Sequence, residues 1–137
     1  MVNPYKIVSD FEQQVAEFTG SKYAVAVDSC TNALFLCCKY FSVQQVTIPC
    51  RTYVSVPCSI IHAGGKVQFE DFIWHKGYQL KPYPIYDNAC VLSRDMYVSG
   101  TYQCLSFSAN KPLRIGKGGM ILTDDQEAVR WFKLARY

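Results

Sequence analysis

Short apolar runs alternate with longer segments of helical periodicity along the chain. The apolar or alternating runs that predict strands cover residues 23–27, 46–49, 66–70, 84–87, 104–107 and 119–123. The segments that predict helices cover residues 9–20, 32–40, 54–63 and 124–137. Continuous apolar runs are typical of strands buried on both faces. Their alternation with helices predicts an α/β fold with a mostly parallel sheet flanked by helices.

Local signals mark where several of these elements begin and end. Ser9 can cap the first helix, and Gly20 can end it. Pro57 lies inside the third helical segment and indicates a kink or a late start. Residues 71–83 are aromatic, contain proline and show no regular period, and residues 88–97 give no clear assignment. The pattern contains no internal repeat, linker or low-complexity segment.

Length and composition restrict the class of protein. A chain of 137 residues, half of them hydrophobic, is long enough for one domain with a core. The formal charge of +3 comes from scattered basic residues and does not favour nucleic acid as a partner. No apolar run approaches the length of a membrane span, and the N-terminus lacks an apolar signal core. We therefore expect a cytoplasmic protein without membrane association.

Cysteine is unusually frequent. The seven cysteines stand at positions 30, 37, 38, 50, 58, 90 and 104. There is no Cys-x-x-Cys pair, and His62 and His75 have no partner at ligand spacing, so the pattern does not favour a metal site. We expect reduced, buried cysteines that pack as small hydrophobic residues, and histidines that are structural or solvated.

The segment between the last two predicted strands is the strongest candidate for chemistry. Lys111 ends a loop of small residues, and the following Pro112 prevents a simple helix there. Gly116, Gly118 and Gly119 permit sharp backbone turns before the next strand. A lysine projecting from such a loop into a cleft can form a Schiff base with a carbonyl group. The alternative is an ordinary lysine in a solvated loop.

Two other stretches place polar groups where α/β folds bind ligands. Thr31 lies at a strand-to-helix turn, where unpaired N–H groups and the helix dipole can hold a phosphate. Asp87 ends a predicted strand, at the edge where open sheets present groups to a ligand. The alternatives are an ordinary helix N-cap and an aspartate in a turn.

Four motifs share one resemblance. Residues 106–123 read Ser-Phe-x-x-x-Lys-x-Leu-x-x-Gly-x-Gly-Gly-x-x-x-Thr, and residues 29–34 read Ser-Cys-Thr-Asn-Ala-Leu. Residues 49–54 read Pro-Cys-Arg-Thr-Tyr-Val, and residues 85–90 read Ile-Tyr-Asp-Asn-Ala-Cys. In this order they resemble the cofactor-lysine, phosphate, stacking and aspartate segments of the DegT/DnrJ/EryC1/StrS family of pyridoxal-phosphate-dependent sugar aminotransferases. The likeness extends, with gaps, from about Phe11 to Tyr137.

The resemblance implies a role for each matching residue. Lys111 takes the position of the family's Schiff-base lysine. Asp87 takes the position under the pyridine nitrogen of pyridoxal phosphate, and Tyr53 that of the aromatic ring against the cofactor. Thr31, the backbone of Asn32 and the side chain of Ser106 match the phosphate-binding positions. Tyr53 could instead be a core or interface tyrosine, and Ser106 a buried strand serine.

Two cysteines depart from the family pattern. Cys30 replaces the glycine of the phosphate turn, where a side chain could crowd the cofactor or require another turn. Cys90 replaces the glutamine or histidine that helps hold the ring hydroxyl, so that contact is lost or supplied by water. Lys111 separates the chain from the family's dehydratase branch, which resembles it but carries histidine at this position.

The resemblance implies the large-domain core of fold-type-I pyridoxal-phosphate enzymes, as a single domain over residues 1–137. Family members carry one more strand and helix where residues 71–83 stand here, and they continue beyond residue 137 into a small C-terminal domain. The chain is therefore either an abridged cofactor domain or an incomplete reading frame.

The implied activity is amino transfer from glutamate to a keto sugar of a nucleotide sugar, in a homodimer whose active sites lie between subunits. Lys111 would also act as the general acid and base. The rival hypothesis is a non-catalytic remnant that binds pyridoxal phosphate or a partner chain. Missing substrate-domain residues favour the remnant, and the intact pair of Lys111 and Asp87 favours the enzyme.

Overall fold

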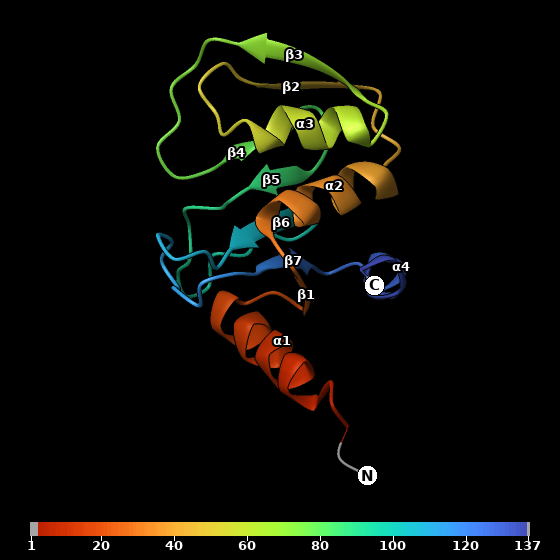
Figure 1. The fold of residues 1–137 in the computed structure, drawn as a ribbon, viewed down its shortest axis with the longest axis vertical. Coiled ribbons are helices and arrows are strands. Elements are labelled where there is room, and N and C mark those ends of the chain that lie inside the picture. Colours follow the sequence, from red (N-terminus) through yellow and green to blue (C-terminus); the bar gives the residue numbers. More distant parts are fainter. Residues whose placement is uncertain (1–2, 137) are drawn as a thin grey trace.

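The strands lie side by side in an order that differs from their order in the chain (Figure 1). The computed structural model describes residues 3–136, and its strands are β1 Tyr23–Val27, β2 Gln45–Pro49, β3 Lys66–Glu70, β4 Tyr78–Gln79, β5 Ile85–Asp87, β6 Tyr102–Ser106 and β7 Gly119–Thr123. One sheet has the order β1-β7-β6-β5-β4, and β2 pairs with β3. An antiparallel bridge of two backbone hydrogen bonds between Thr47 in β2 and Lys81, just after β4, joins the pair to the sheet.

Strand direction shows a mixed sheet in which most strands share one direction. The pairs β2–β3 and β5–β6 are parallel, whereas β1–β7, β6–β7 and β4–β5 are antiparallel. Followed from strand to strand through the bridge at Thr47, these pairings make β1, β2, β3, β5 and β6 run one way. Strands β4 and β7 run against them. The sheet is therefore mixed: β7 lies between β1 and β6, and β4 lies between β5 and β2, and in each case it runs opposite to both neighbours.

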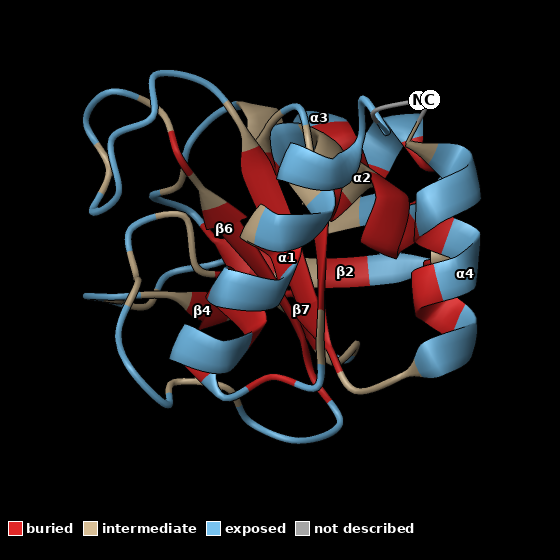
Figure 2. Cartoon of the chain, turned by 90° about the horizontal axis from the view of Figure 1, so that it is seen from below, coloured by how far each residue is buried: buried red, intermediate tan, exposed pale blue. Residues whose placement is uncertain are grey.

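The central strands are apolar at consecutive positions because helices cover both of their faces. The helices are α1 Lys6–Thr19, α2 Cys30–Tyr40, α3 Ser55–His62 and α4 Gln126–Ala135. In β7, Ile121 packs into the larger core, which includes residues of α2, α3 and α4. Its neighbours Met120 and Leu122 pack on the opposite face with Val15 of α1. Figure 2 shows these helices with exposed outer surfaces and buried inner ones.

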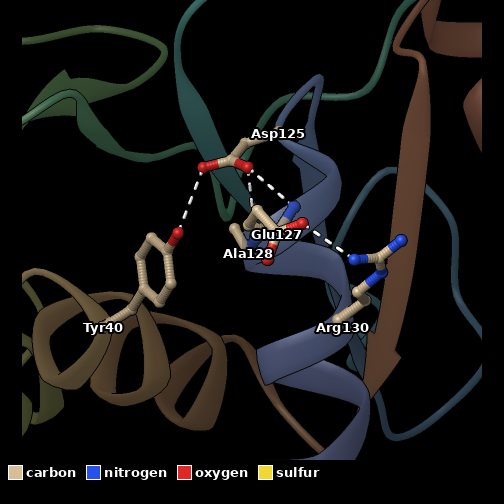
Figure 3. Close-up of polar contacts among 5 residues, drawn as sticks. All are labelled: Tyr40, Asp125, Glu127, Ala128 and Arg130. Atoms are coloured by element: carbon tan, nitrogen blue, oxygen red, sulfur yellow. Dashed lines mark hydrogen bonds and ion pairs between the residues drawn. The ribbon is translucent and has the colours of Figure 1, made fainter.

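Asp125 fixes the start of α4 and attaches it to α2 (Figure 3). Its carboxylate accepts the N–H groups of Glu127 and Ala128 at 2.9 and 3.2 Å. It also accepts the hydroxyls of Tyr40, the last residue of α2, at 3.2 Å and of Tyr102 at 2.6 Å. The hydrogen bond from Tyr102 lowers the pKa of Asp125 below its ordinary value. The cap therefore also carries tertiary contacts.

The helix boundaries match the predicted ones only in part. The first helix begins before Ser9, because Tyr5 occupies the cap position without a side-chain hydrogen bond. Its end at Gly20, with a left-handed φ of 76°, is as predicted. Pro57 causes neither a kink nor a late start, because it lies in the first turn of α3, where proline is tolerated. The predicted end of the last helix, Tyr137, lies outside the described residues.

The segment 71–83, predicted to be irregular, contributes the short reversed strand β4. Tyr78 pairs with Asp87 and Gln79 with Tyr86, and both pairs are antiparallel. Because Lys81 then bridges to β2, this segment fills the space between β5 and β2. The resemblance implies that family members carry an additional strand and helix here, whereas this chain has the two-residue strand β4 and its flanking loops.

Strand β2 has one buried face and one polar face. In β2, Val46 and Ile48 belong to the larger core, whereas Gln45 and Thr47 point to the other side. Gln45 donates a hydrogen bond to Gln68 of β3 across that polar face. Strict alternation of this kind is typical of a sheet with one solvated face. This half of the described chain is therefore built from two layers.

The cysteines only partly follow the prediction. All seven are free thiols, and Cys30, Cys37, Cys38 and Cys104 are buried as expected. The other three, Cys50, Cys58 and Cys90, are exposed, because they follow a strand, lie on the outer side of α3 and occupy the turn after β5. Among residues 3–136, no helix is long and apolar enough to cross a membrane.

Candidate functional site

A cavity of about 340 Å³ opens where β5 and β6 end and α2 begins. Its volume lies in the range of small-molecule sites, roughly 300–1,000 Å³. Five residues singled out from the sequence line it, although they come from four separate segments: Thr31, Tyr53, Asp87, Ser106 and Lys111. Asn32 and Cys90, which were also singled out, do not line it.

Asp87 forms the buried acidic end of the cavity. Strand β5 delivers its carboxylate, which is 8% exposed. One oxygen accepts the N–H of Ala89 at 3.1 Å, and the other accepts the hydroxyl of Tyr78 at 2.9 Å. Burial raises the pKa of Asp87, and these two hydrogen bonds and the charge of Lys111 oppose that rise. The site thus holds a desolvated carboxylate with built-in donors.

Lys111 faces the cavity from the loop between β6 and β7. Its backbone N–H donates to Ser108 at 3.0 Å, which closes a turn, and the positive φ angles of Gly116 and Gly118 bring the chain back to β7. The Lys111 Nζ donates to the Sγ of Cys90 at 3.3 Å. Cys90 therefore contacts the lysine itself.

The N-terminus of α2 forms the third side. Ser29 caps this helix by accepting the N–H of Asn32 at 3.1 Å, so that N–H is already bonded. The hydroxyl of Thr31 donates to Ser55 Oγ at 2.9 Å. Cys30 lines the cavity within this turn, with its Sγ 3.9 Å from Asp87 Oδ1 and 3.5 Å from the carbonyl oxygen of Cys104. The departure at Cys30 is accommodated without a different helix start.

Strand β7 approaches this turn very closely. A Cβ at Gly119 would lie 2.4 Å from the carbonyl carbon of Ser29 and 2.6 Å from the nitrogen of Cys30. Only glycine fits there, so the loop of Lys111 and the start of α2 are held together by backbone contact.

Tyr53 and Ser106 complete the set. Tyr53 lines the cavity but is 74% exposed, so its ring face is available to a ligand and it is not a core residue. Ser106 ends β6, and its Oγ lies 3.3 Å from that of Ser108. These hydroxyls extend the polar wall that begins at Ser29 and Thr31.

The sequence model of the DegT/DnrJ/EryC1/StrS aminotransferase family matches residues 1–87 and 94–137. The chain belongs to this family. A curated relative, the spore coat polysaccharide biosynthesis protein SpsC of Bacillus subtilis, is 28% identical over 88% of the chain and 42% of its own length.

Solved structures show the same fold. DesI, solved in the presence of its TDP-sugar product, matches with a TM-score of 0.79 and 20% identity over 96% of this chain and 44% of its own. DesV of S. venezuelae, solved with a ketimine intermediate, matches with a TM-score of 0.80 and 16% identity over 99% and 48%. This family member therefore has the fold-type-I architecture, and it spans less than half the length of these relatives.

Family membership supports pyridoxal phosphate as the cofactor, and the residues present fit it. A planar cationic ring needs a carboxylate and a flat contact surface, which Asp87 and Tyr53 offer. A phosphate needs hydroxyls and a helix N-terminus, which Ser29 and Thr31 at the start of α2 offer. An aldehyde needs an amine, which Lys111 offers.

Several lining residues were not singled out from the sequence: Asp28, Ser29, Ser55, Ser108, Asn110 and Lys117. Most are neighbours of predicted site residues, so proximity in sequence was the available signal. Tyr78, which bonds Asp87, carried no such signal. It stands in the aperiodic segment 71–83, and only long-range strand pairing brings it to the site.

Proposed function

We propose that residues 1–137 form the cofactor domain of a pyridoxal-phosphate-dependent sugar aminotransferase. The observation that carries the proposal is the convergence of Lys111, Asp87 and the N-terminus of α2 on one cavity. An amine, a buried carboxylate and an anion-binding helix start are the three groups that this cofactor requires together. A chain retained only for its fold would not need all three groups at one cavity.

When bound, the cofactor supplies an electron sink that stabilises negative charge on a carbon of the substrate. The protein supplies the remaining functions. Asp87 holds a proton on the ring nitrogen through a charge-assisted hydrogen bond. Tyr53 covers one ring face, and Ser29, Thr31 and Ser106 orient the phosphate. Lys111 would hold the cofactor at its aldehyde group, and as a free amine it would carry a proton as general acid and base at its Nζ.

The substrates proposed are glutamate as the amino donor and a nucleotide-linked keto sugar as the acceptor. Their support is the family and the TDP-sugar product present with DesI. The loop of Lys111 borders the cavity and is exposed over most of residues 109–117, so a large acceptor could approach from that side.

A homodimer is proposed as the assembly. Tyr53 lines the cavity and is exposed, and its chain neighbour Val54 and two residues of the Lys111 loop, Leu113 and Ile115, are exposed apolar side chains as well. Apolar surface of this kind marks interaction sites, and a second subunit would cover the exposed face of Tyr53. The cytoplasm is the proposed compartment, in keeping with seven free thiols.

The second candidate function is cofactor binding without transamination, alone or with a partner chain. Residues 1–137 span 42–48% of the length of the relatives described above, so this candidate concerns the 137-residue chain by itself. Positioned substrate contacts can contribute roughly 7–11 kcal/mol to catalysis in the best cases. We therefore expect the 137-residue chain to bind cofactor better than it turns over a sugar.

Borohydride trapping separates these possibilities. Purified chain is mixed with pyridoxal phosphate and reduced, and the adduct is located by peptide mass spectrometry, with Lys111→Arg as the matched control. We expect the adduct on Lys111 and its loss in the control. An adduct on Lys117, or none, would contradict the proposal. Stopped-flow spectra with glutamate, followed by product analysis with a keto-sugar nucleotide, then distinguish an enzyme from a binding remnant.

A further inference from the structure

Asp87 has a hydrogen-bond donor that comes from an unexpected part of the chain. Tyr78 belongs to β4, in the segment that stands where a βα unit was expected. Its ring is buried, at 5% exposure, and its hydroxyl donates to Asp87 Oδ2 at 2.9 Å. Strand pairing holds the two residues in place, because Tyr78 and Asp87 are direct partners in the β4–β5 ladder.

The same hydroxyl contacts Thr52. A tyrosine hydroxyl carries one proton, and ionised Asp87 can only accept, so the Tyr78 proton goes to Asp87. Thr52 must then donate to the Tyr78 oxygen, with which it is in hydrogen-bond contact. The result is a relay in which Thr52 donates to Tyr78 and Tyr78 donates to Asp87.

The relay also reaches the loop that carries Tyr53, the residue after Thr52. Trp74, from the same segment as Tyr78, donates its indole N–H to the carbonyl oxygen of Arg51 at 2.7 Å. The rings of Trp74 and Tyr78 lie 5.0 Å apart. Two aromatic residues of segment 71–83 therefore hold both Asp87 and the loop that precedes α3.

We infer that Tyr78 is a positioning residue of the cofactor site, which keeps Asp87 ionised and ties it through Thr52 to the loop of Tyr53. This inference rests on the proposed function. Segment 71–83 thereby supplies support for the site at the place where the expected βα unit is absent. In a buried site a donor to a carboxylate stabilises the charged form, which is the form that pairs with a protonated ring nitrogen.

The groups that face Asp87 come from several elements. Tyr78 reaches it from β4, Cys30 from α2, Cys104 from β6 and Lys111 from the loop after β6. Tyr78 and Lys111 favour the ionised carboxylate, and burial opposes it. Because burial raises the pKa of the Tyr78 phenol, that hydroxyl stays protonated and remains a donor at ordinary pH.

The test measures the titration of Asp87 in the chain without added cofactor. Carboxyl carbon chemical shifts are followed by NMR against pH, with the Asp87 signal assigned by its loss in Asp87→Asn. Removal of the donor in Tyr78→Phe should raise the midpoint by about one pH unit, a tenfold change in proton affinity. Tyr83→Phe is the matched control, since its hydroxyl lies in the same segment but accepts the N–H of Gln44.

A second arm follows the affinity for pyridoxal phosphate against pH. Loss of affinity on the acid side should begin about one unit higher in Tyr78→Phe than in the parent or in Tyr83→Phe. Should the parent fail to take up cofactor, the proposed function fails, while the titration still decides the role of Tyr78. Should Tyr78→Phe fail to fold, Thr52→Val must move the midpoint upward by a smaller amount. A midpoint that is unchanged relative to Tyr83→Phe, or unchanged in Thr52→Val, overturns the inference.

Discussion

Replacing Gly119 by alanine should weaken cofactor binding by disturbing the contacts to the phosphate, while the contacts to the rest of the cofactor stay the same. The new Cβ would lie 2.4 Å from the carbonyl carbon of Ser29, whereas ordinary contact begins at 3.4 Å, so the two backbones must separate by about 3.4 − 2.4 = 1.0 Å. Both neighbours are backbone atoms, and no side chain can rotate away. Overpacking of this kind costs about 1–3 kcal/mol of folding free energy. For a chain of this size we expect Tm to fall by roughly 3–10 °C.

The displaced backbone is the start of α2, where the phosphate is proposed to bind. Losing one charge-assisted hydrogen bond there corresponds to at least about tenfold weaker binding. Pyridoxal, which lacks the phosphate, should lose little affinity. Fluorescence titration with pyridoxal phosphate and with pyridoxal therefore measures the effect as a ratio of two affinities.

Gly64→Ala provides the matched control. Gly64 has a φ of +97°, and no atom lies within 4 Å of the place that a Cβ would occupy, so alanine there costs only the strain of a positive φ, about 1–2 kcal/mol. It lies beyond the end of α3, away from the cavity. If Gly119→Ala and Gly64→Ala have equal affinity ratios, the backbone contact between β7 and α2 does not shape the phosphate site, and the reasoning is refuted.

Three other outcomes are expected. Glu12→Gln should lower the free energy of urea unfolding by about 3 kcal/mol, because this buried carboxylate pairs with Arg136 and Lys133. The control Glu17→Gln, at an exposed position, should change it by less than about 0.5 kcal/mol. Equal effects of the two substitutions would contradict the role of the buried cluster. Asp125 has a lowered pKa, so its contribution to stability is present above pH 3.8 and is lost as pH falls through the lower folded value. Asp125→Asn keeps the helix cap and should reduce this loss of unfolding free energy at acid pH. An unchanged dependence of the unfolding free energy on acid pH would argue against this role. Light scattering at micromolar concentration should give the mass of a dimer, and a monomeric mass would count against the proposed assembly.

Most strand positions could be predicted because they depend on local patterns. The runs at residues 23–27, 66–70 and 119–123 coincide with β1, β3 and β7. Strand β6 begins at Tyr102, two residues before the predicted start, because Gln103 is polar yet buried. Its amide oxygen accepts from Asn88 and its nitrogen donates to Thr101, so its burial depends on partners that no local pattern reveals.

The residues of the candidate site likewise fall into those that local patterns reveal and those that only long-range contacts bring together. Lys111, Asp87 and Thr31 could be recognised because each stands at a fixed offset from glycines, strand ends or helix starts. The bond between Lys111 and Cys90 and that between Tyr78 and Asp87 could not, because both join segments with no shared motif. The reversed direction of β4 was missed for a related reason: two residues form no recognisable period, and their geometry comes from pairing with β5 and β2.

The single strand-to-strand bridge at Thr47 and Lys81 suggests two units that would differ in how readily they open. Residues 45–70 comprise β2, α3 and β3. In the described chain they join the main sheet through one bridge of two backbone hydrogen bonds. Their other attachments are core packing by Val46, Ile48 and Ile60, contacts of α3 with α2, and side-chain bonds from segment 71–83. A unit attached in this way is expected to open at lower free energy than the rest, with earlier hydrogen exchange. Tyr53 belongs to this unit, whereas Asp87 and Lys111 belong to the other. A ligand that contacts Tyr53, Asp87 and Lys111 would link the two units. Binding should therefore slow hydrogen exchange throughout β2 and β3, including residues that the ligand does not touch.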